Sequence, residues 1–400
     1  MDRFIGVLGL ALMLGIAWAF STDRRKVNPR LVVWGLILQF AFALLVMKTT
    51  VGVAIFGGLS NAVTLALQKA DAGAEFVFGP LAKSETLGFI FAFKALPTII
   101  YISSFFSVLY YLGILQKLVL FMAKIMVRTM GTSGAESLST AANVFMGQTE
   151  APLVVMPYIA SMTHSELCTL MVGGMATISG GMMAAYISMG IEAKFLLAAS
   201  VMNAPAAIVM AKILVPETGT PLTKGAVKLE VERTEVNMID AAARGAGAGL
   251  NLALNVGAML IAFLSLVALV NWPLQYVGLS LEQVFAWIFA PLAFVMGVPW
   301  ADAGQVGALF GEKLILNEFV AYAHLVKLQA ANVLAPRSEL IATYALCGFA
   351  NLGSIGIQLG GIGGIAPTRK SDLAKLGLRV LLGGSLATFM TATIAGLLNP

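Results

Sequence analysis

Asn143-Val-Phe-Met-Gly-Gln-Thr-Glu-Ala-Pro152 and Leu314-Ile-Leu-Asn-Glu-Phe-Val-Ala321 place two carboxylates, Glu150 and Glu318, inside strongly apolar stretches. A carboxylate at membrane depth costs about 2.5–3.5 kcal/mol on insertion scales, so it persists mainly where it lines a polar cavity. Each stretch is followed by the tripeptide Ser-Glu-Leu, at 165–167 and at 338–340, and then by an apolar segment interrupted by polar residues and glycine. A module used twice in this way is typical of the binding site of a secondary transporter.

The composition of the whole chain is that of a membrane protein. Hydrophobic residues make up 59% of the 400 residues and charged residues only 11%, whereas soluble domains carry roughly 25% charge. The mean hydropathy is +0.89. The basic residues that give the net charge of +5 lie beside apolar segments. This is the positive-inside pattern, so the charge indicates membrane orientation rather than binding to nucleic acid.

Eight segments are predicted to cross the bilayer, since a crossing helix needs about 20 apolar residues. They are residues 4–20, 31–47, 95–115, 167–189, 195–214, 251–271, 341–366 and 380–398. The basic loops after the first, third, fifth and seventh segments then fall on one side. This predicts a multi-pass protein of the inner (plasma) membrane with both termini on the periplasmic or extracellular face.

Two further apolar stretches, residues 134–161 and 301–335, contain proline, glycine or charged residues near their middle. Irregular backbone at membrane depth is tolerated only where it is buried in protein or lines water. We therefore expect two re-entrant helical hairpins that enter from opposite sides, as an inverted repeat requires. Residues 51–69 and 281–296 are predicted to be interfacial helices. The fold class is an all-α polytopic membrane protein with eight transmembrane helices, in which Glu150 and Glu318 face one shared pocket.

The interruptions carry the polar groups that such a pocket needs. Amide, hydroxyl and carboxylate follow one another in Gly147-Gln-Thr-Glu150, and further amides and hydroxyls occur in Asn317-Glu318, Thr177-Ile178 and Asn351-Leu-Gly-Ser354. No arginine or lysine is expected to accompany the two carboxylates. The residues alone therefore indicate a neutral solute rich in hydroxyls and amides, such as a sugar, nucleoside or amide, together with a small cation.

An enzyme is the alternative class of protein. Gly131-Thr-Ser-Gly134 matches the Gly-x-Ser-Gly pattern of intramembrane serine proteases of the rhomboid type. However, Ser133 and Glu136 have the spacing of a capping box, and no histidine is placed as a base in a later segment. We interpret Ser133 as a helix cap and expect no catalytic residues.

At these motifs the chain resembles the concentrative nucleoside transporter family, of the bacterial, sodium-coupled type. The matching segments are Gly147-Gln-Thr-Glu-Ala-Pro-Leu-Val-Val155, Asn317-Glu-Phe-Val-Ala321 and Phe349-Ala-Asn-Leu-Gly-Ser-Ile-Gly356, and the likeness covers nearly the whole chain. The resemblance implies a homotrimer in the lipid bilayer that imports nucleosides by elevator-type alternating access. It implies Na⁺ as the coupling ion and no other cofactor. A proton-coupled nucleoside symporter and a symporter for another small polar solute remain alternatives.

The resemblance also assigns roles to individual residues. It places Gln148, Thr149, Glu150, Met182 and Phe349 around the nucleobase, and Glu318, Asn351 and Ser354 at the ribose hydroxyls. It places Na⁺ at the side chains of Asn143 and Thr177 and at the backbone carbonyls of Met146 and Ile178. A smaller aliphatic residue is more typical of the family at position 182, which leaves the preference for purine or pyrimidine open.

Four parts follow from this resemblance and from the order of the segments. Residues 1–115 are expected to form scaffold helices 1–3 with an interfacial helix. Residues 116–215 are the first transport repeat, with the first hairpin, broken helix 4 and helix 5. Residues 216–280 are a cytoplasmic linker and scaffold helix 6, and residues 281–400 are the second repeat, with an interfacial helix, the second hairpin, broken helix 7 and helix 8.

Overall fold

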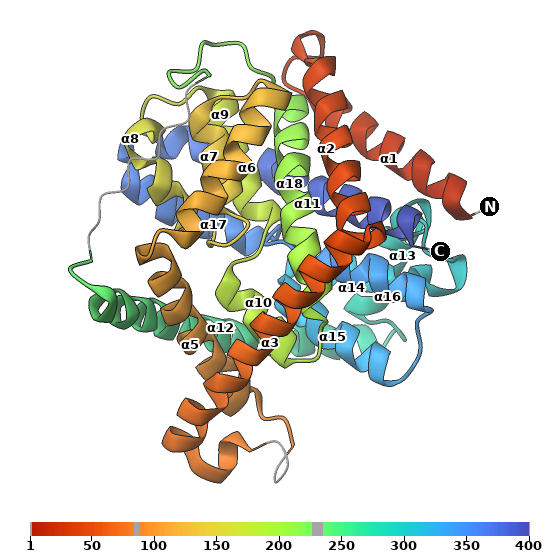
Figure 1. Ribbon diagram of the computed structural model, residues 1–400. Coiled ribbons are helices and arrows are strands. Elements are labelled where there is room, and N and C mark those ends of the chain that lie inside the picture. The colour runs from red at the N-terminus through yellow and green to blue at the C-terminus, as the bar shows by residue number, and fades with distance from the viewer. Residues whose placement is uncertain (1, 84–87, 226–234, 400) are drawn as a thin grey trace.

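The computed structural model describes residues 2–83, 88–225 and 235–399, and within them the named elements are all helices (Figure 1). The first part of the chain forms α1 (Asp2–Ala19), η1 (Arg24–Lys26), α2 (Pro29–Lys48), α3 (Thr50–Phe78), η2 (Gly79–Ala82), α5 (Phe91–Tyr111) and α6 (Ile114–Met130). The middle part forms α7 (Gly134–Ala142), η3 (Ala151–Val155), α8 (Met156–Ile159), α9 (His164–Ala176), α10 (Gly180–Ser188), α11 (Ala193–Leu214) and α12 (Met238–Gln275). The last part forms α13 (Leu281–Val295), α14 (Trp300–Ile315), α15 (Glu318–Ala330), α16 (Pro336–Leu346), α17 (Leu352–Ile365), η4 (Pro367–Arg369) and α18 (Lys370–Leu398).

The two predicted helix breaks are confirmed. The fourth predicted span divides into α9 and α10, and the seventh divides into α16 and α17. Each second half begins with a side-chain cap: the Ser179 hydroxyl accepts from the Met182 amide at 3.3 Å, and Asn351 Oδ1 accepts from the Ser354 amide at 2.8 Å. Such caps satisfy backbone N–H groups that a helix start leaves without partners. Residues within the breaks themselves therefore determine where the second halves begin.

The two predicted hairpins are also present. In the second repeat, α14 and α15 are the two arms, and only Leu316 and Asn317 separate them. In the first repeat, α7 is the first arm, but the return arm consists of the short elements η3 and α8. Pro152 and Pro157 lie in these two elements, and proline lacks the backbone N–H that a longer helix would need.

Three segments differ from the prediction. The third predicted span ends early because Gly113 takes a left-handed conformation, with φ of 78°, and the following helix, α6, was not predicted. The segment 51–69 belongs to α3, a helix of 29 residues that is long and apolar enough to cross a membrane. The predicted linker 216–245 becomes helical from Met238, and its residues 226–234 lie outside the described part of the chain.

Length and composition identify seven of the described helices as able to cross a membrane, or eight if α13 and α14, which are bent by 118°, count as one broken span. The shorter helices α1 and α17 do not meet this criterion by themselves. Several of the seven are equally apolar but differ in position. In the most apolar 18-residue stretches of α9–α10 and α11, 100% and 94% of the residues are buried. In those of α3 and α12, only 6% are buried. The interior is thus formed by α9, α10, α11 and α18, which pack on one another.

Helix α12 lies along α5 at the edge of the molecule, as Figure 1 shows below the main bundle. A Cβ added at Gly245 would lie 2.8 Å from the Ser103 carbonyl oxygen, and one at Gly249 would lie 2.8 Å from Ile100 Cα. Glycines spaced by four residues allow this close approach of two apolar helices, which gain little from the hydrophobic effect in lipid.

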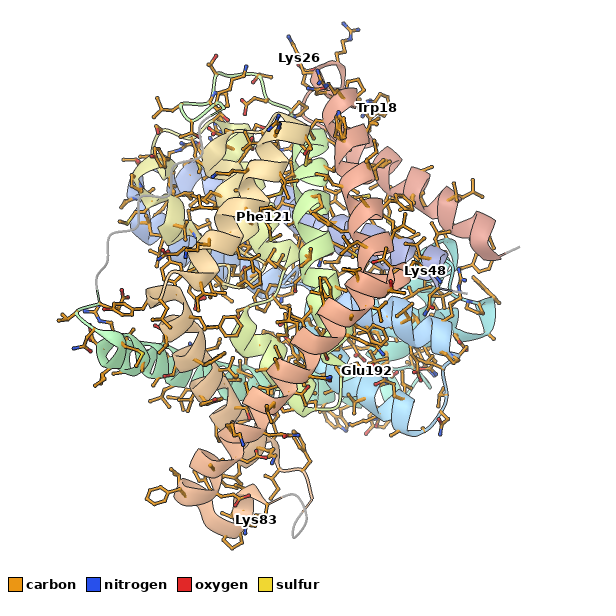
Figure 2. All side chains as sticks on the ribbon, in the orientation of Figure 1. Trp18, Lys26, Lys48, Lys83, Phe121 and Glu192 are labelled. Atoms are coloured by element: carbon orange, nitrogen blue, oxygen red, sulfur yellow. The ribbon has the colours of Figure 1, made fainter. Side chains whose placement is uncertain are left out.

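The basic turn after α1 and the start of the linker after α11 lie at the same end of the molecule (Figure 1). Figure 2 shows Lys26 at this end and Lys83, which follows η2, at the opposite end. This arrangement agrees with the predicted charge bias of the loops, in which the basic residues after the first and fifth spans share one side.

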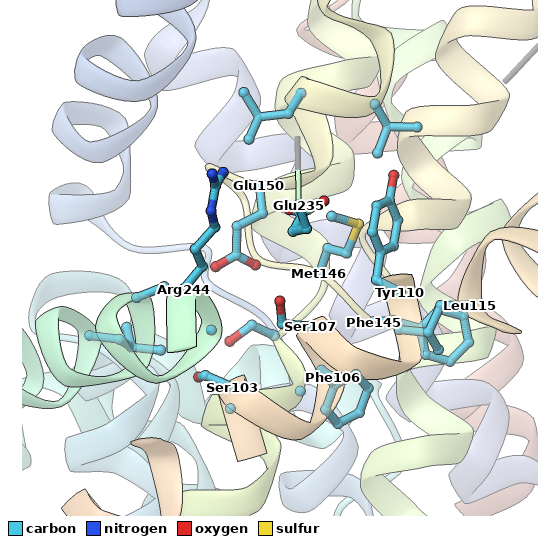
Figure 3. Close-up of a pocket in the computed structure, with 18 of the residues that line it drawn as sticks. Ser103, Phe106, Ser107, Tyr110, Leu115, Phe145, Met146, Glu150, Glu235 and Arg244 are labelled. Atoms are coloured by element: carbon cyan, nitrogen blue, oxygen red, sulfur yellow. The ribbon is translucent and has the colours of Figure 1, made fainter. Parts of the chain in front are cut away.

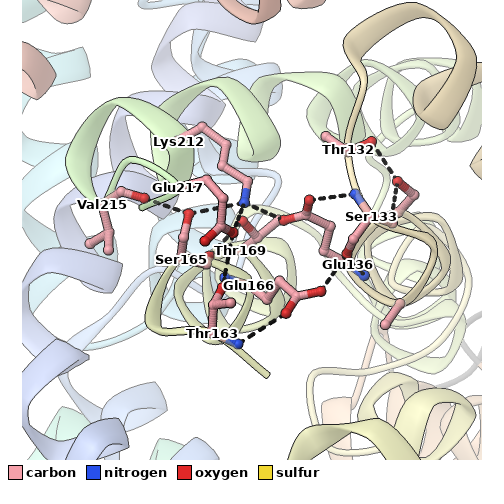
Figure 4. Close-up of polar contacts among 12 residues, drawn as sticks. Thr132, Ser133, Glu136, Thr163, Ser165, Glu166, Thr169, Lys212, Val215 and Glu217 are labelled. Atoms are coloured by element: carbon pink, nitrogen blue, oxygen red, sulfur yellow. Dashed lines mark hydrogen bonds and ion pairs between the residues drawn. The ribbon is translucent and has the colours of Figure 1, made fainter. Parts of the chain in front are cut away.

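A buried polar network joins α7, α9 and α11 near the start of the linker that follows α11 (Figure 4). Ser133 and Thr163 begin α7 and α9 with complete capping boxes, and the Ser133 hydroxyl donates to Glu166 Oε1 at 2.5 Å. Lys212 Nζ lies 2.7 Å from Glu136 Oε2 and 3.2 Å from Glu217 Oε2. The prediction that Ser133 is a helix cap is confirmed, and the network fixes the first hairpin arm to the core helices.

Lys212→Met is expected to lower the midpoint of thermal unfolding, because it leaves Glu136, which is 1% exposed, without its cation. Breaking a buried ion pair by removing one partner costs about 3–5 kcal/mol. The control is Lys194→Met, which removes an exposed pair with Glu192 worth about 0–1 kcal/mol. Equal shifts for the two variants, measured by thermal unfolding of the purified protein, would contradict a stabilising role for the network.

Candidate functional site

The tip of the first hairpin lies against the break between α9 and α10. Helix α7 ends at Asn143, and the Gly180 amide donates to the Phe145 carbonyl at 3.1 Å. A Cβ added at Gly173, in the last turn of α9, would lie 3.3 Å from Asn143 Nδ2. The absence of a side chain at Gly173 therefore lets the hairpin tip come close to the end of α9.

The tip of the second hairpin places Glu318 at the first position of α15. Asn317 caps this helix, since its Oδ1 accepts from the Val320 amide at 2.9 Å. Glu318 is 3% exposed, and its two carboxylate oxygens accept from the Tyr186 hydroxyl at 2.8 Å and from Asn351 Nδ2 at 3.1 Å. A buried carboxylate needs such donors, and each oxygen keeps further lone pairs for a ligand.

A chain of hydrogen bonds connects the two hairpin tips through the start of α17. Gln148 Nε2, on the first tip, donates to the Ser354 hydroxyl at 3.1 Å. The Ser354 amide donates to Asn351 Oδ1, and Asn351 Nδ2 reaches Glu318 on the second tip. The structure thus brings together four of the predicted site residues, Gln148, Ser354, Asn351 and Glu318, from segments up to 206 residues apart.

Glu150 has a different position from the other site residues. Its Oε2 accepts from the Gly147 amide at 2.7 Å, and its side chain is exposed to a cavity of about 480 Å³. Figure 3 shows Glu150 in this cavity with Ser103 and Ser107 of α5 and Arg244 of α12. Glu318 is not among the residues that line it. This cavity by itself therefore does not join the two carboxylates, and the expectation that Glu150 and Glu318 face one shared pocket stays a prediction.

The other residues assigned to the nucleobase lie at the same junction. Thr149 is exposed and contacts α17, since a Cβ added at Gly361 would lie 3.0 Å from its methyl group. Met182 is buried in the first turn of α10. Phe349 is buried in the break before α17, and its amide donates to the Thr177 carbonyl at 3.2 Å. The two breaks are therefore hydrogen-bonded to each other.

The predicted cation ligands include an acceptor without a partner. Asn143 is fully buried; its Nδ2 donates to the Ser139 carbonyl, but its Oδ1 has no hydrogen-bond partner. The Thr177 hydroxyl donates to the Gly173 carbonyl at 2.9 Å and so keeps lone pairs free. Among the described residues, no hydrogen bond outside the helices reaches the carbonyls of Met146 or Ile178. Buried oxygens left without donors are a suitable set of ligands for a hard cation.

Sequence reasoning missed four residues of this junction. Gln358 of α17 donates to Gln148 Oε1 and to the Met171 carbonyl, and Tyr186 of α10 donates to Glu318. Asn203 of α11 is fully buried and donates to the carbonyls of both Ala176 and Cys347, one at each break. Lys313 of α14 is fully buried as well. Only the polar character of Asn203, Gln358 and Lys313 within apolar helices signalled a role, because their partners are far away in sequence.

The fold and the site define a class: a polytopic membrane transporter in which two re-entrant hairpins and two broken helices form a polar junction. Sequence comparisons give the family. Residues 8–81 and 195–396 match the profiles described as the N-terminus and the C-terminus of Na⁺-dependent nucleoside transporters, and residues 92–193 match the profile described as nucleoside recognition. The chain belongs to the concentrative nucleoside transporter family; it is a nucleoside transporter of the membrane and not an enzyme.

Individual relatives and solved structures support this assignment. The nucleoside permease NupC of Helicobacter pylori is 41% identical, over 99% of this chain and 98% of the relative. Rat solute carrier family 28 member 3 is 44% identical over the whole of this chain, which covers 59% of that longer protein. The structure of CNTnw in an inward-facing, substrate-bound state is 42% identical, with a TM-score of 0.93 over 99% of this chain and 98% of CNTnw. A CNTnw variant in an intermediate state has a TM-score of 0.95 over the full length of both chains.

Proposed function

We propose that this transporter imports nucleosides in symport with Na⁺. The observation that carries the proposal is the environment of Glu318, a buried carboxylate that shares one polar chain with Asn351, Ser354 and Gln148. A carboxylate accepts from vicinal hydroxyls such as those of ribose, and a glutamine amide offers both a donor and an acceptor to the edge of a base. In this proposal Glu318, Asn351 and Ser354 bind the ribose, and Gln148, Thr149, Glu150, Met182 and Phe349 surround the base.

Na⁺ is the proposed coupling ion because the first repeat leaves oxygens without donors. Asn143 Oδ1 is buried without a partner, and its side chain lies against Gly173, whose carbonyl accepts from the Thr177 hydroxyl. With the carbonyls of Met146 and Ile178, these groups form the proposed Na⁺ site. The site includes the same hairpin tip that carries Gln148, so binding of the cation orders a segment that binds the nucleoside, and each ligand raises the affinity for the other.

The proposed mechanism is alternating access of the elevator type in a homotrimer. Asn203 and Lys212 bond the two broken helices and the first hairpin to α11. The second hairpin is bonded to the broken helices through Glu318 and Lys313, so these elements form one unit. Helices α5 and α12 pack on each other outside this unit, through the close approach of Gly245 and Gly249 to α5. The described relative CNTnw has been solved in inward-facing, intermediate and outward-facing states, which supports movement of the first unit past the second.

An uptake panel in proteoliposomes tests the proposal. Purines, pyrimidines, their free bases and sugars are presented with an inward Na⁺ gradient, with a pH gradient in Na⁺-free buffer, and with no gradient. Accumulation of nucleosides above equilibrium is expected only with the Na⁺ gradient. Full accumulation driven by the pH gradient would show that the coupling ion is the proton and not Na⁺. Uptake of sugars or amides without uptake of nucleosides would overturn the proposed substrate.

A further inference from the structure

Lys313 is a buried basic side chain that the proposed mechanism does not yet use. It lies in the last turn of α14, the first arm of the second hairpin, and its side chain has 0% exposure. The expectation that no cation accompanies the site carboxylates is therefore wrong, since Lys313 and Glu318 are five residues apart and both are buried. Burial of an isolated ammonium is so costly that it requires compensating groups on every side.

Three groups compensate the Lys313 ammonium. Nζ donates to the Ala345 carbonyl at 2.6 Å and to the Thr388 hydroxyl at 2.8 Å, and it lies 5.5 Å from the centre of the Phe389 ring. The Thr388 hydroxyl donates its own proton to the Ser385 carbonyl, so it is an acceptor toward Lys313. Three N–H groups thus face a carbonyl, a hydroxyl oxygen and an aromatic face, which is the full donor capacity of an ammonium.

The carbonyl partner of Lys313 lies at a special place in the fold. Ala345 is in the last turn of α16, directly before the break that leads to Asn351. The C-terminal end of a helix carries unpaired carbonyls and a partial negative charge, and a cation there is stabilising. Lys313 therefore holds the end of α16, and Asn203 of α11 donates to the Cys347 carbonyl two residues further on.

In the first repeat, the last turn of α9 corresponds to the last turn of α16, and the side chain that lies against it is an acceptor and not a donor. There the first hairpin arm presents Asn143 to the last turn of α9, and Asn143 Oδ1 is an acceptor without a donor. Each hairpin arm thus places one polar side chain against the last turn of a broken helix. In the first repeat this side chain leaves an acceptor without a donor, and in the second repeat it supplies a donor of its own.

We propose that Lys313 is the fixed cation of the second repeat: its ammonium takes the place that a mobile cation takes in the first repeat and holds the broken end of α16, in the same hairpin that carries Glu318. No ion pair within 4.0 Å joins Lys313 to Glu318 among the described residues, so Lys313 acts on the ligand through the position of the α16–α17 break and through its field. It is a positioning residue, and the inference rests on the proposed function.

The test compares Lys313→Met, which keeps the volume but removes the charge, with Lys327→Met, an exposed lysine on the other arm of the same hairpin. Binding of a ribonucleoside and of its 2′,3′-dideoxy analogue is measured by calorimetry at fixed Na⁺. Because Lys313 acts through the contact between Glu318 and the ribose, complete loss of that charge-assisted contact, roughly 10- to 150-fold in affinity, sets the upper limit of the effect. With Lys313→Met we expect a loss of ribonucleoside affinity within this limit, of about tenfold, and a much smaller loss for the dideoxy analogue. Lys327→Met should bind both ligands as the wild type does.

A chemical rescue experiment tests the role of Lys313 independently of the proposed function. Lys313→Ala leaves a cavity with the volume of propylammonium, and such a cavity can bind a small ligand. Propylammonium, but not 1-propanol, is expected to raise the unfolding midpoint of Lys313→Ala without nucleoside, and to leave the wild type and Lys313→Met unchanged. Nucleoside affinity of Lys313→Ala should recover in parallel.

Three results would overturn the inference. One is wild-type ribonucleoside affinity in Lys313→Met. The second is equal rescue of Lys313→Ala by propylammonium and propanol. The third is failure of Lys313→Met to fold while Lys327→Met folds, which would make Lys313 a purely structural group. Absence of nucleoside binding in the wild type would instead contradict the proposed function, and the rescue of thermal stability would still decide the role of Lys313.

Discussion

Glu318→Gln is expected to lower nucleoside affinity by roughly 10- to 150-fold while leaving the protein folded. The carboxylate accepts from Tyr186 and Asn351 and has lone pairs left for the ribose hydroxyls. A neutral amide of the same shape loses the charge-assisted part of these hydrogen bonds, which is worth about 1.5–3 kcal/mol. Equilibrium binding to purified protein at saturating Na⁺ measures the change.

The ligand supplies the control for this prediction. Removing the 2′- and 3′-hydroxyls should cost the wild type far more affinity than it costs Glu318→Gln, because the variant has already lost the partner of those hydroxyls. Equal penalties in the two proteins would place Glu318 away from the ribose. Glu192→Gln, which changes an exposed carboxylate, should bind both ligands as the wild type does.

Asn143→Ala is expected to raise the Na⁺ concentration for half-maximal uptake by about tenfold or more. The substitution removes Oδ1, the buried acceptor without a partner, and an ion contact worth about 1.5 kcal/mol corresponds to about a tenfold change. By linkage, nucleoside affinity at low Na⁺ should fall as well. The measurement is uptake into proteoliposomes over a range of Na⁺ concentrations.

Nucleoside affinity at saturating Na⁺ distinguishes Asn143→Ala from Glu318→Gln. The nucleoside affinity of Asn143→Ala should return toward the wild-type value as Na⁺ is raised, because its defect lies in the ion site. The affinity of Glu318→Gln should stay low at every Na⁺ concentration. An unchanged Na⁺ dependence in Asn143→Ala would rule out the proposed ion site.

Local signals in the sequence determined the breaks, the caps and the hairpins. Ser179 and Asn351 start the second halves of the broken helices, and Ser133 and Ser280 start α7 and α13 with capping boxes. These signals are reliable because a cap satisfies backbone N–H groups only two or three residues away. The carboxylates of Glu150 and Glu318 were equally visible, since their cost in an apolar stretch demands an explanation.

Tertiary structure alone decided which polar groups meet. Gln148 pairs with Ser354, Tyr186 with Glu318, and Lys313 with Ala345 and Thr388, and these partners are between 32 and 206 residues apart. It also gave the two carboxylates different surroundings: Glu150 lines the cavity, whereas Glu318 is buried against Tyr186 and Asn351. Hydropathy does not place apolar helices either: α11 and α3 are equally apolar, yet 94% of the residues in the apolar part of α11 are buried and only 6% of those in α3. In lipid, apolar surface gains little from burial, so close packing of small residues and polar contacts across the core decide which helix lies inside.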